Sequence, residues 1–255
     1  MNQALRSRID DIVSSIDLAE WMATWREMQG GSIRERHFRQ LVEILPFEGE
    51  HIRAMTEDVK ERADFYLAYA EFKVYARDFP RIVPLYTTAA NLYAQYYGKE
   101  SREVLNATDL LAGSLAGIGQ FGTAANLQQT DYDLAVKNFG PDDTLTWRFA
   151  NNLADTFRAL GAPARALELD LMLLAKRTEH YGRDHFNVLV TANNTAQDYL
   201  DLGDYAGAMR SFELNRQIAE VLREQDPGWE VQAQTWLLYT QLFFGRQQFD
   251  AVQGW

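Results

Sequence analysis

The stretch Gly117–Gly122, GIGQFG, matches G-x-G-x-x-G, the glycine pattern of a loop that binds the pyrophosphate of a dinucleotide. Such a loop works because its glycines turn a β-strand tightly into a helix N-terminus, where backbone N–H groups face the phosphates. The preceding residues, NATDLLAGSLA, are rich in alanine and leucine and poor in β-branched residues. They predict a helix where the motif requires a strand, so we expect no nucleotide at this loop.

Three further groups of residues have side chains that could do chemistry. His180, Asp184 and His185 could ligate a metal, but zinc needs three or four converging ligands, and we expect these residues to pack or cap an inter-repeat loop. Ser114 has neither the flanking pattern nor the preceding strand of a nucleophile elbow. The carboxylates of Asp142–Asp143 stand at a predicted helix start, where they complement the helix dipole. We therefore predict no catalytic residue, no cofactor and no metal.

The composition narrows the class of partner. The 255 residues include no cysteine, which excludes disulfides, thiolate zinc sites and cysteine nucleophiles. The formal net charge of −11 argues against a nucleic-acid partner and against docking on an anionic membrane. The N-terminus lacks the apolar core of a signal peptide, and the densest apolar run, WLLYTQLFF, is too short to span a membrane. We expect a cytoplasmic protein.

Glycines recur along the chain with a period of 42 residues. One series with this step is Gly119, Gly161, Gly203 and Gly245, and a second is Gly98, Gly140 and Gly182. Alanine also occurs seven residues before and five residues after the first three glycines of the first series. Two independent series with one period indicate a repeat protein.

Each repeat unit predicts two helices. In TLTWRFANNLADTFRALG the apolar residues share one helical face, namely Ala150, Leu153, Ala154, Phe157 and Leu160. Gly161 ends this helix, and a second begins with Pro163 in its first turn, where proline is tolerated. Gly182 ends the second helix, and small residues at Ala154 and Ala166 allow the paired helices to approach closely.

These offsets resemble those of tetratricopeptide repeats, whose helix pairs place a small residue, an aromatic residue and a later alanine at the same positions. The longer period and the phrases FANNLADTFRALG and GRDHFNVLVTANNTAQDYLDLGDYAGA are similar to the kinesin-light-chain type, over about residues 98–245. The resemblance implies an all-α superhelical stack of antiparallel helix pairs. The chain departs from the family where Phe186 and Asp142 or Asp143 replace the usual His-Pro, and where Gln241 replaces an aromatic residue.

The predicted organisation is an N-terminal helical extension over residues 1–56 followed by repeats over residues 57–255. The predicted units are 57–97 (divergent, with Arg77 at the glycine position), 98–139, 140–181, 182–223 and 224–255 (partial or capping). In the extension, Trp21 and Trp25 form either a docking stripe for another protein or a face that packs on the first repeat.

Polar residues recur on the first helix of each middle unit, opposite the apolar stripe. They are Asn106 and Asp109, then Arg148, Asn151, Asp155 and Arg158, then Asn193 and Gln197. The resemblance implies that this face lines a concave peptide-binding groove. Asparagine suits an extended peptide because its amide both donates and accepts hydrogen bonds. Since Asp155 can neutralise only one of the two arginines well, we expect the other to be available to an acidic ligand group; a merely solvated face is the alternative.

The predicted function is a scaffold that binds a protein or an extended peptide, without catalysis. Two alternatives stay open, because a fold does not specify a function. One is a regulatory module that senses a signalling peptide and changes an attached partner. The other is an accessory subunit that presents a substrate peptide to a separate enzyme and should co-purify with it.

We expect NAD, ATP and S-adenosylmethionine to leave the melting temperature of the protein unchanged. A specific ligand at 100 times its Kd would add roughly 2.7 kcal/mol of stability, which thermal denaturation detects easily. A saturable rise with any of the three compounds would contradict our interpretation of GIGQFG.

Overall fold

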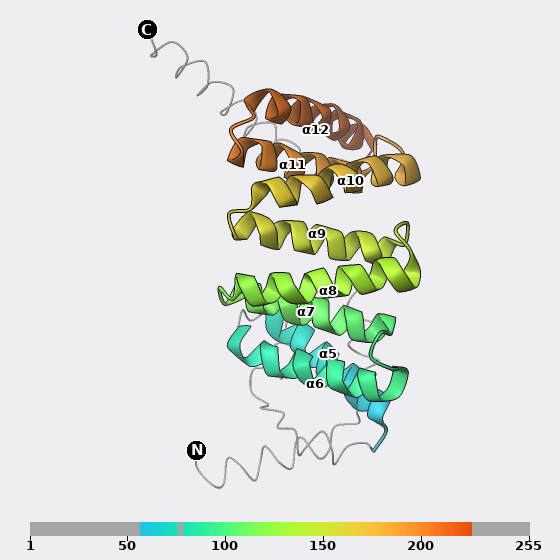
Figure 1. The fold of residues 1–255 in the computed structure, drawn as a ribbon. Helices are drawn as coiled ribbons and strands as arrows, with labels where there is room; N and C mark the ends of the chain where they lie inside the picture. The colour runs from blue at the N-terminus through green and yellow to red at the C-terminus, as the bar shows by residue number, and fades with distance from the viewer. Residues whose placement is uncertain (1–56, 76–78, 226–255) are drawn as a thin grey trace, which may run out of the picture. The chain divides into compact units, whose positions relative to one another are not determined.

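The computed structural model describes residues 57–75 and 79–225 (Figure 1), and these residues contain helices and turns but no strand. Eight helices follow one another in this part of the chain: α5 (Val59–Tyr75), α6 (Phe79–Tyr97), α7 (Arg102–Gly117), α8 (Phe121–Phe139), α9 (Thr144–Ala159), α10 (Pro163–Tyr181), α11 (Phe186–Asp201) and α12 (Tyr205–Gln225). The bounds of α7, α9 and α11 are displaced from one another by 42 residues at both ends. The predicted helix pairs and their register are therefore confirmed for these helices.

The chain divides into two compact units between Gln120 and Phe121. In the first unit α6 packs against both α5 and α7. Its core is built largely from small residues and tyrosines, because alanines such as Ala63, Ala89 and Ala107 let the helices approach closely and Tyr93 fills the space beside them.

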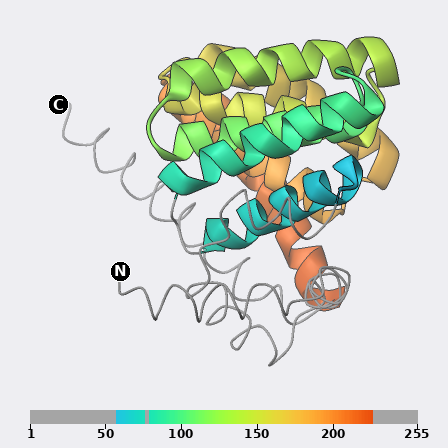
Figure 2. The ribbon, with the colours of Figure 1, turned by 90° about the horizontal axis from the view of Figure 1, so that it is seen from below.

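In the second unit each helix from α8 to α12 packs against the next, in chain order (Figures 1 and 2). Leu153, Ala154 and Phe157 of α9 are buried against Ala125 and Ala166, on the helices before and after it. These are residues that the sequence places on the packing face of α9 or at a point of close approach. The core of this unit therefore follows the repeat pattern.

A glycine after the first helix of each pair, as between α9 and α10, makes the turn into the second helix possible. Gly161 has φ 72° and Gly203 has φ 76°, a left-handed conformation that costs other residues energy. The N–H of Gly161 donates to the carbonyl of Arg158, and the N–H of Ala162 donates to that of Phe157. These paired bonds form a Schellman cap, which satisfies carbonyls at the helix end.

The stretch GIGQFG is one of these turns. Gly117 is the last residue of α7, Gly119 has φ 82° in the turn, and Gly122 lies in the first turn of α8. The N–H of Gln120 donates to the carbonyl of Leu115, as in the cap after α9. The strand that a dinucleotide loop requires is therefore replaced by a helix, as the sequence predicts.

Several sequence predictions lie outside the described residues. They concern the extension over 1–56 with Trp21 and Trp25, Arg77, and all but the first two residues of the last unit over 224–255, with Gln241 and Gly245. The division of the chain into units stays a prediction as a whole. Among the helices that the structure describes, none is long and apolar enough to cross a membrane.

Alanine substitutions should separate the turn glycines from the helical one. Gly161→Ala and Gly203→Ala should each lower the free energy of unfolding by about 1–2 kcal/mol, because a Cβ is disfavoured at positive φ. Gly122→Ala should cause no loss, since Gly122 is helical and a Cβ there meets no atom within 4 Å. Urea denaturation of the three variants measures these differences, and an equal loss at Gly122 and Gly161 would refute the assignment of the turn.

Candidate functional site on α9 and α11

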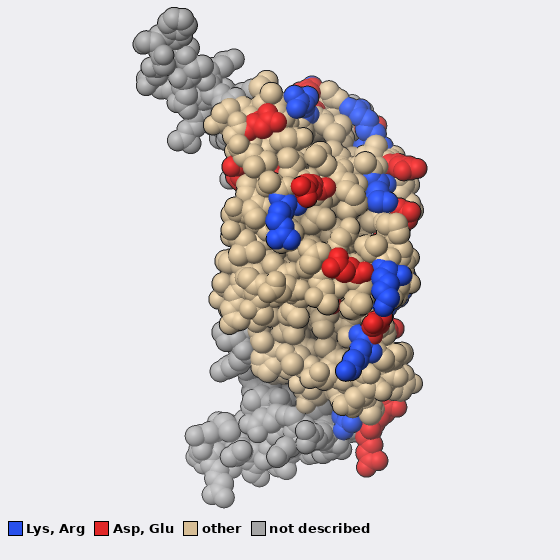
Figure 3. All heavy atoms as spheres, in the orientation of Figure 1, with Lys and Arg blue, Asp and Glu red and all other residues tan. Residues whose placement is uncertain are grey.

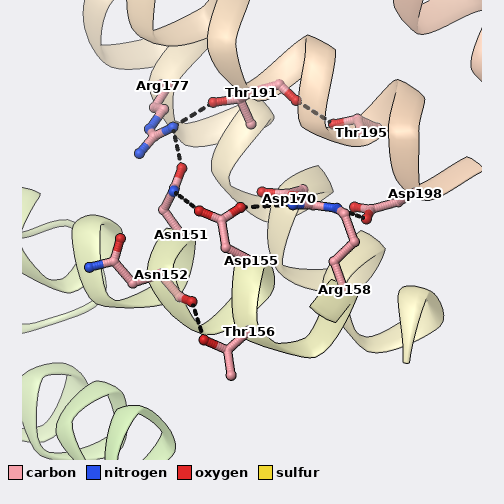
Figure 4. A network of polar contacts seen from close by, with 10 residues as sticks. All are labelled: Asn151, Asn152, Asp155, Thr156, Arg158, Asp170, Arg177, Thr191, Thr195 and Asp198. Carbon is pink, nitrogen blue, oxygen red and sulfur yellow. Dashed lines mark hydrogen bonds and ion pairs between the residues drawn. The ribbon is translucent and has the colours of Figure 1, made fainter. Parts of the chain in front are cut away.

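The structure places the predicted polar residues on three helices, α7, α9 and α11. Asn106 and Asp109 lie on α7, and the other six lie on α9 and α11. Arg148, Asp155 and Gln197 are exposed, and Asn106, Asn151, Arg158 and Asn193 are half-buried. The structure connects three residues of this set directly, through the polar network of Figure 4, and these are Asn151, Asp155 and Arg158.

Arg158 lies at the centre of that network. Its Nη1 donates to Asp155 of α9, its Nη2 to Asp170 of α10 and its Nε to Asp198 of α11, each at 2.7 Å (Figure 4). Asp155 and two further carboxylates therefore engage Arg158, so Arg158 is not the arginine that the sequence leaves for a ligand. Asp170 and Asp198 lie 12 and 40 residues further along the chain, and only the packing of three helices brings them to the guanidinium.

The electrostatics of the network follow from burial. Burial works against the charge of Arg158, but its hydrogen bonds with Asp198 and Asp155 outweigh burial and raise its pKa. Asp170 and Asp198 are fully buried, and burial raises the pKa of both carboxyl groups. Removing the guanidinium would leave the buried carboxyl groups of Asp170 and Asp198 without their arginine partner. Arg158 therefore has a structural role.

A second arginine joins α9 to α11. The Nη1 of Arg177 donates to Oδ1 of Asn151 at 3.2 Å and to Oγ1 of Thr191 at 2.6 Å. The Nδ2 of Asn151 donates to Asp155 at 3.3 Å. An amide has two N–H donors and two acceptor lone pairs, so Asn151 keeps one of each beyond these bonds. Its side chain is held in one orientation from both ends.

The side chain of Asn193 is placed differently. It lies on α11 two residues after Thr191, the residue that Arg177 binds, and at the position equivalent to Asn151 one repeat later. It is half-buried, and its amide makes no hydrogen bond with any residue that the structure describes. Gln197, one turn further along α11, donates to Asp201 at 2.9 Å.

The prediction that Asp109 lies on the exposed polar face is wrong. Its exposed fraction is 2%, so it does not lie on an open polar surface. It shares a buried stripe of α7 with Leu105 and Ala112, and α7 packs against α6. The equivalent Asn151 is half-buried, so a shared place in the repeat does not guarantee shared exposure.

Sequence reasoning missed Asp170, Asp198 and Arg177. A signal for the two aspartates exists, because each falls on a buried helical stripe: Asp170 lies between Ala166 and Leu173 in α10. A charge on a core stripe requires a partner. The spacing within one helix indicates that a partner exists but does not identify it.

The residues that could have suggested catalysis or metal binding serve as caps and packing groups. The Nδ1 of His185 accepts from the N–H of Asn187 at 3.1 Å and caps α11, while its ring stacks on Tyr181. Asp143 caps α9, and the hydroxyl of Ser114 donates to a carbonyl within α7. Within the described ranges no three His, Cys, Asp or Glu residues are placed to hold a metal.

Comparison with known proteins agrees with this architecture. Residues 148–187 match the tetratricopeptide repeat family. The apo form of RapI has a similar structure (TM-score 0.67, 12% identity, covering 94% of this chain and 87% of RapI). So does a candidate kinesin light chain from Podosopora anserina (TM-score 0.64, 18% identity, covering 82% and 96%). A Rap protein complexed with Competence and Sporulation Factor is also similar (TM-score 0.59, 15% identity, covering 91% and 70%). No curated protein sequence matches the chain.

The fold is thus that of an all-α tetratricopeptide-like stack, in which helices pack sequentially in pairs. The chain contains a tetratricopeptide repeat, and its structure matches those of kinesin-light-chain-like repeat proteins.

Two arginine substitutions should distinguish structural from surface roles on α9. Arg158→Ala should lower the free energy of unfolding by about 3–5 kcal/mol, because it leaves buried carboxylates without their partner. Arg148→Ala, on the exposed side of the same helix, should change it by no more than about 0.5 kcal/mol. Urea denaturation checks both values, and similar midpoints for the two variants would show that the network contributes little.

Proposed function

We propose that the chain binds a protein or an extended peptide through the polar residues of α9 and α11, without catalysing a reaction. The observation that carries this proposal is the pair of half-buried asparagines at equivalent positions, Asn151 and Asn193. The first retains unused hydrogen-bonding capacity, and the second has no hydrogen bond with a described residue. Amides in this state suit a peptide backbone, which offers donors and acceptors in alternation.

The network beneath this face supports the proposal physically. Arg177 and Asp155 hold the side chain of Asn151 in place, so a ligand would not have to order it. Such preorganisation lowers the entropic cost of binding. The exposed Arg148 lies on α9 outside the Arg158 network and is the residue that we assign to an acidic group of the ligand.

The comparisons support a peptide ligand in general terms. A Rap protein of similar fold is described as a complex with Competence and Sporulation Factor. We infer from this similarity of fold that a peptide-sensing regulatory role is the second candidate. A sensor would change shape when its peptide binds, whereas a scaffold would change little.

We further propose a cytoplasmic protein whose partner is neither nucleic acid nor membrane. The net charge of −11 supports this, since phosphates attract basic surfaces. On the face drawn in Figure 3 basic and acidic side chains are interspersed, without a broad basic patch.

Binding should depend on Arg148 and Asn193. A pull-down with the full chain identifies a partner, and calorimetry then measures its affinity for each variant. Arg148→Ala should weaken binding by about tenfold or more, because hydrogen bonds to charged groups contribute about 1.5–3 kcal/mol. Asn193→Ala should weaken it by about two- to tenfold, as expected for a neutral hydrogen bond.

Asn126→Ala is the matched control, because Asn126 is an exposed asparagine of α8 in the same unit. It should bind like the unaltered protein. If Arg148→Ala and Asn193→Ala also bind like the unaltered protein while Trp21→Ala or Trp25→Ala abolishes binding, the partner docks on the N-terminal extension instead. An enzyme recovered in the pull-down would favour the accessory-subunit alternative.

A further inference from the structure

The junction of α9, α10 and α11 contains two carboxyl groups that are incompletely paired. Asp170 and Asp198 both have an exposed fraction of 0%. Each gives one oxygen to Arg158, Oδ2 of Asp170 and Oδ1 of Asp198. The other two oxygens, Oδ1 of Asp170 and Oδ2 of Asp198, are buried and accept no hydrogen bond from the described residues. A buried carboxylate oxygen without a donor is costly.

The charges around this pair do not balance. From α9 it faces Arg158 and Asp155, and the Asp155 carboxylate also binds Arg158. From α10 Arg177 also acts on Asp170, although its hydrogen bonds go to Asn151 and Thr191. From α11 Asp201 adds a further negative charge close to Asp198. Two guanidinium groups therefore stand against four carboxylates, and two of these carboxylates are fully buried.

We propose that Asp170 and Asp198 share one proton in the folded protein, and that this proton is a pH-sensitive link between α10 and α11. The two carboxyl groups bind neighbouring nitrogens of one guanidinium, Asp170 at Nη2 and Asp198 at Nε of Arg158, so they lie close together. A proton taken from solvent onto Asp170 turns one of the two acceptor groups into a donor, and Asp198 can accept this hydrogen bond. It also removes one of the two buried negative charges.

The electrostatic environment agrees with a proton on Asp170. Burial, followed by the charge of Asp198 and the hydrogen bond with it, raises the pKa of Asp170 to about 8. Since an aspartate in an unfolded chain has a pKa of about 3.9, the folded state binds more protons between these values. The free energy of unfolding therefore falls as pH rises through this interval, and the contribution of the proton is lost above about pH 8.

Loss of the proton would affect the helices that carry the candidate face. Two like charges would then oppose each other between α10 and α11, with one guanidinium between them. The same guanidinium holds Asp155, which in turn accepts from Asn151. The link does not depend on any partner, so its test is independent of the proposed function.

The test measures how the melting temperature depends on pH, both in the unaltered protein and in the variant Asp170→Asn. Between about pH 6 and pH 9 the melting temperature of the unaltered protein should fall by about 4 °C or more. In Asp170→Asn the amide N–H donates to Asp198 at every pH, and its oxygen still accepts from Arg158, so this fall should disappear. Asp133→Asn, which removes an exposed carboxylate of α8, should keep it.

A fall of equal size in Asp170→Asn, or no fall in the unaltered protein, would overturn the proposal. If Asp170→Asn does not fold, Asp198→Asn replaces the other carboxyl group of the pair by an amide, and the fall in melting temperature should disappear in that variant. Carboxyl carbon NMR of the unaltered protein, with labelled aspartate, gives a direct reading. It should show an aspartate that titrates above about pH 6, and titration of every aspartate below about pH 5 would also overturn the proposal.

Discussion

The second unit depends on two buried carboxyl groups, Asp170 and Asp198, whose arginine partner lies on another helix. Arg158 extends from α9 and finds its partners on α9, α10 and α11. Because an unpaired buried charge costs several kcal/mol, these helices are stable together only in the arrangement that lets all the bonds form. The repeat pattern does not supply this constraint, since the positions 42 residues before and after Arg158 are Ala116 and Leu200. The network is a local feature of one layer of the stack.

That layer separates two roles that look alike in the sequence. Arg158 donates to Asp155 and to the two buried aspartates. Arg177 donates to Asn151 and Thr191, and Asn151 donates to Asp155. Asn193, in the equivalent place one repeat later, has no such partner among the described residues. A polar face on a repeat helix is thus partly structural and partly available for recognition. The proposed binding function draws on the second part and is positioned by the first.

The turns show how a repeat protein uses residue types that elsewhere perform chemistry. Glycines at positive φ close the helix ends, and His185 and Asp143 provide acceptors to the first backbone N–H groups of α11 and α9. Unsatisfied backbone groups at helix ends have to be capped in any stack of short helices. Residues that resemble a phosphate loop or a metal site therefore arise here from the needs of capping.

The sequence by itself determined the helix pairs, their 42-residue register, the turn glycines and the resemblance to tetratricopeptide repeats. These features are local, because a helical face and its cap depend on residues within about five positions of one another. Only the tertiary structure decided that Arg158 is engaged, that Asp109 is buried and that Asp170 and Asp198 meet. The reason is that such contacts depend on how far apart and at what rotation three helices pack, and spacing along one helix does not encode these quantities.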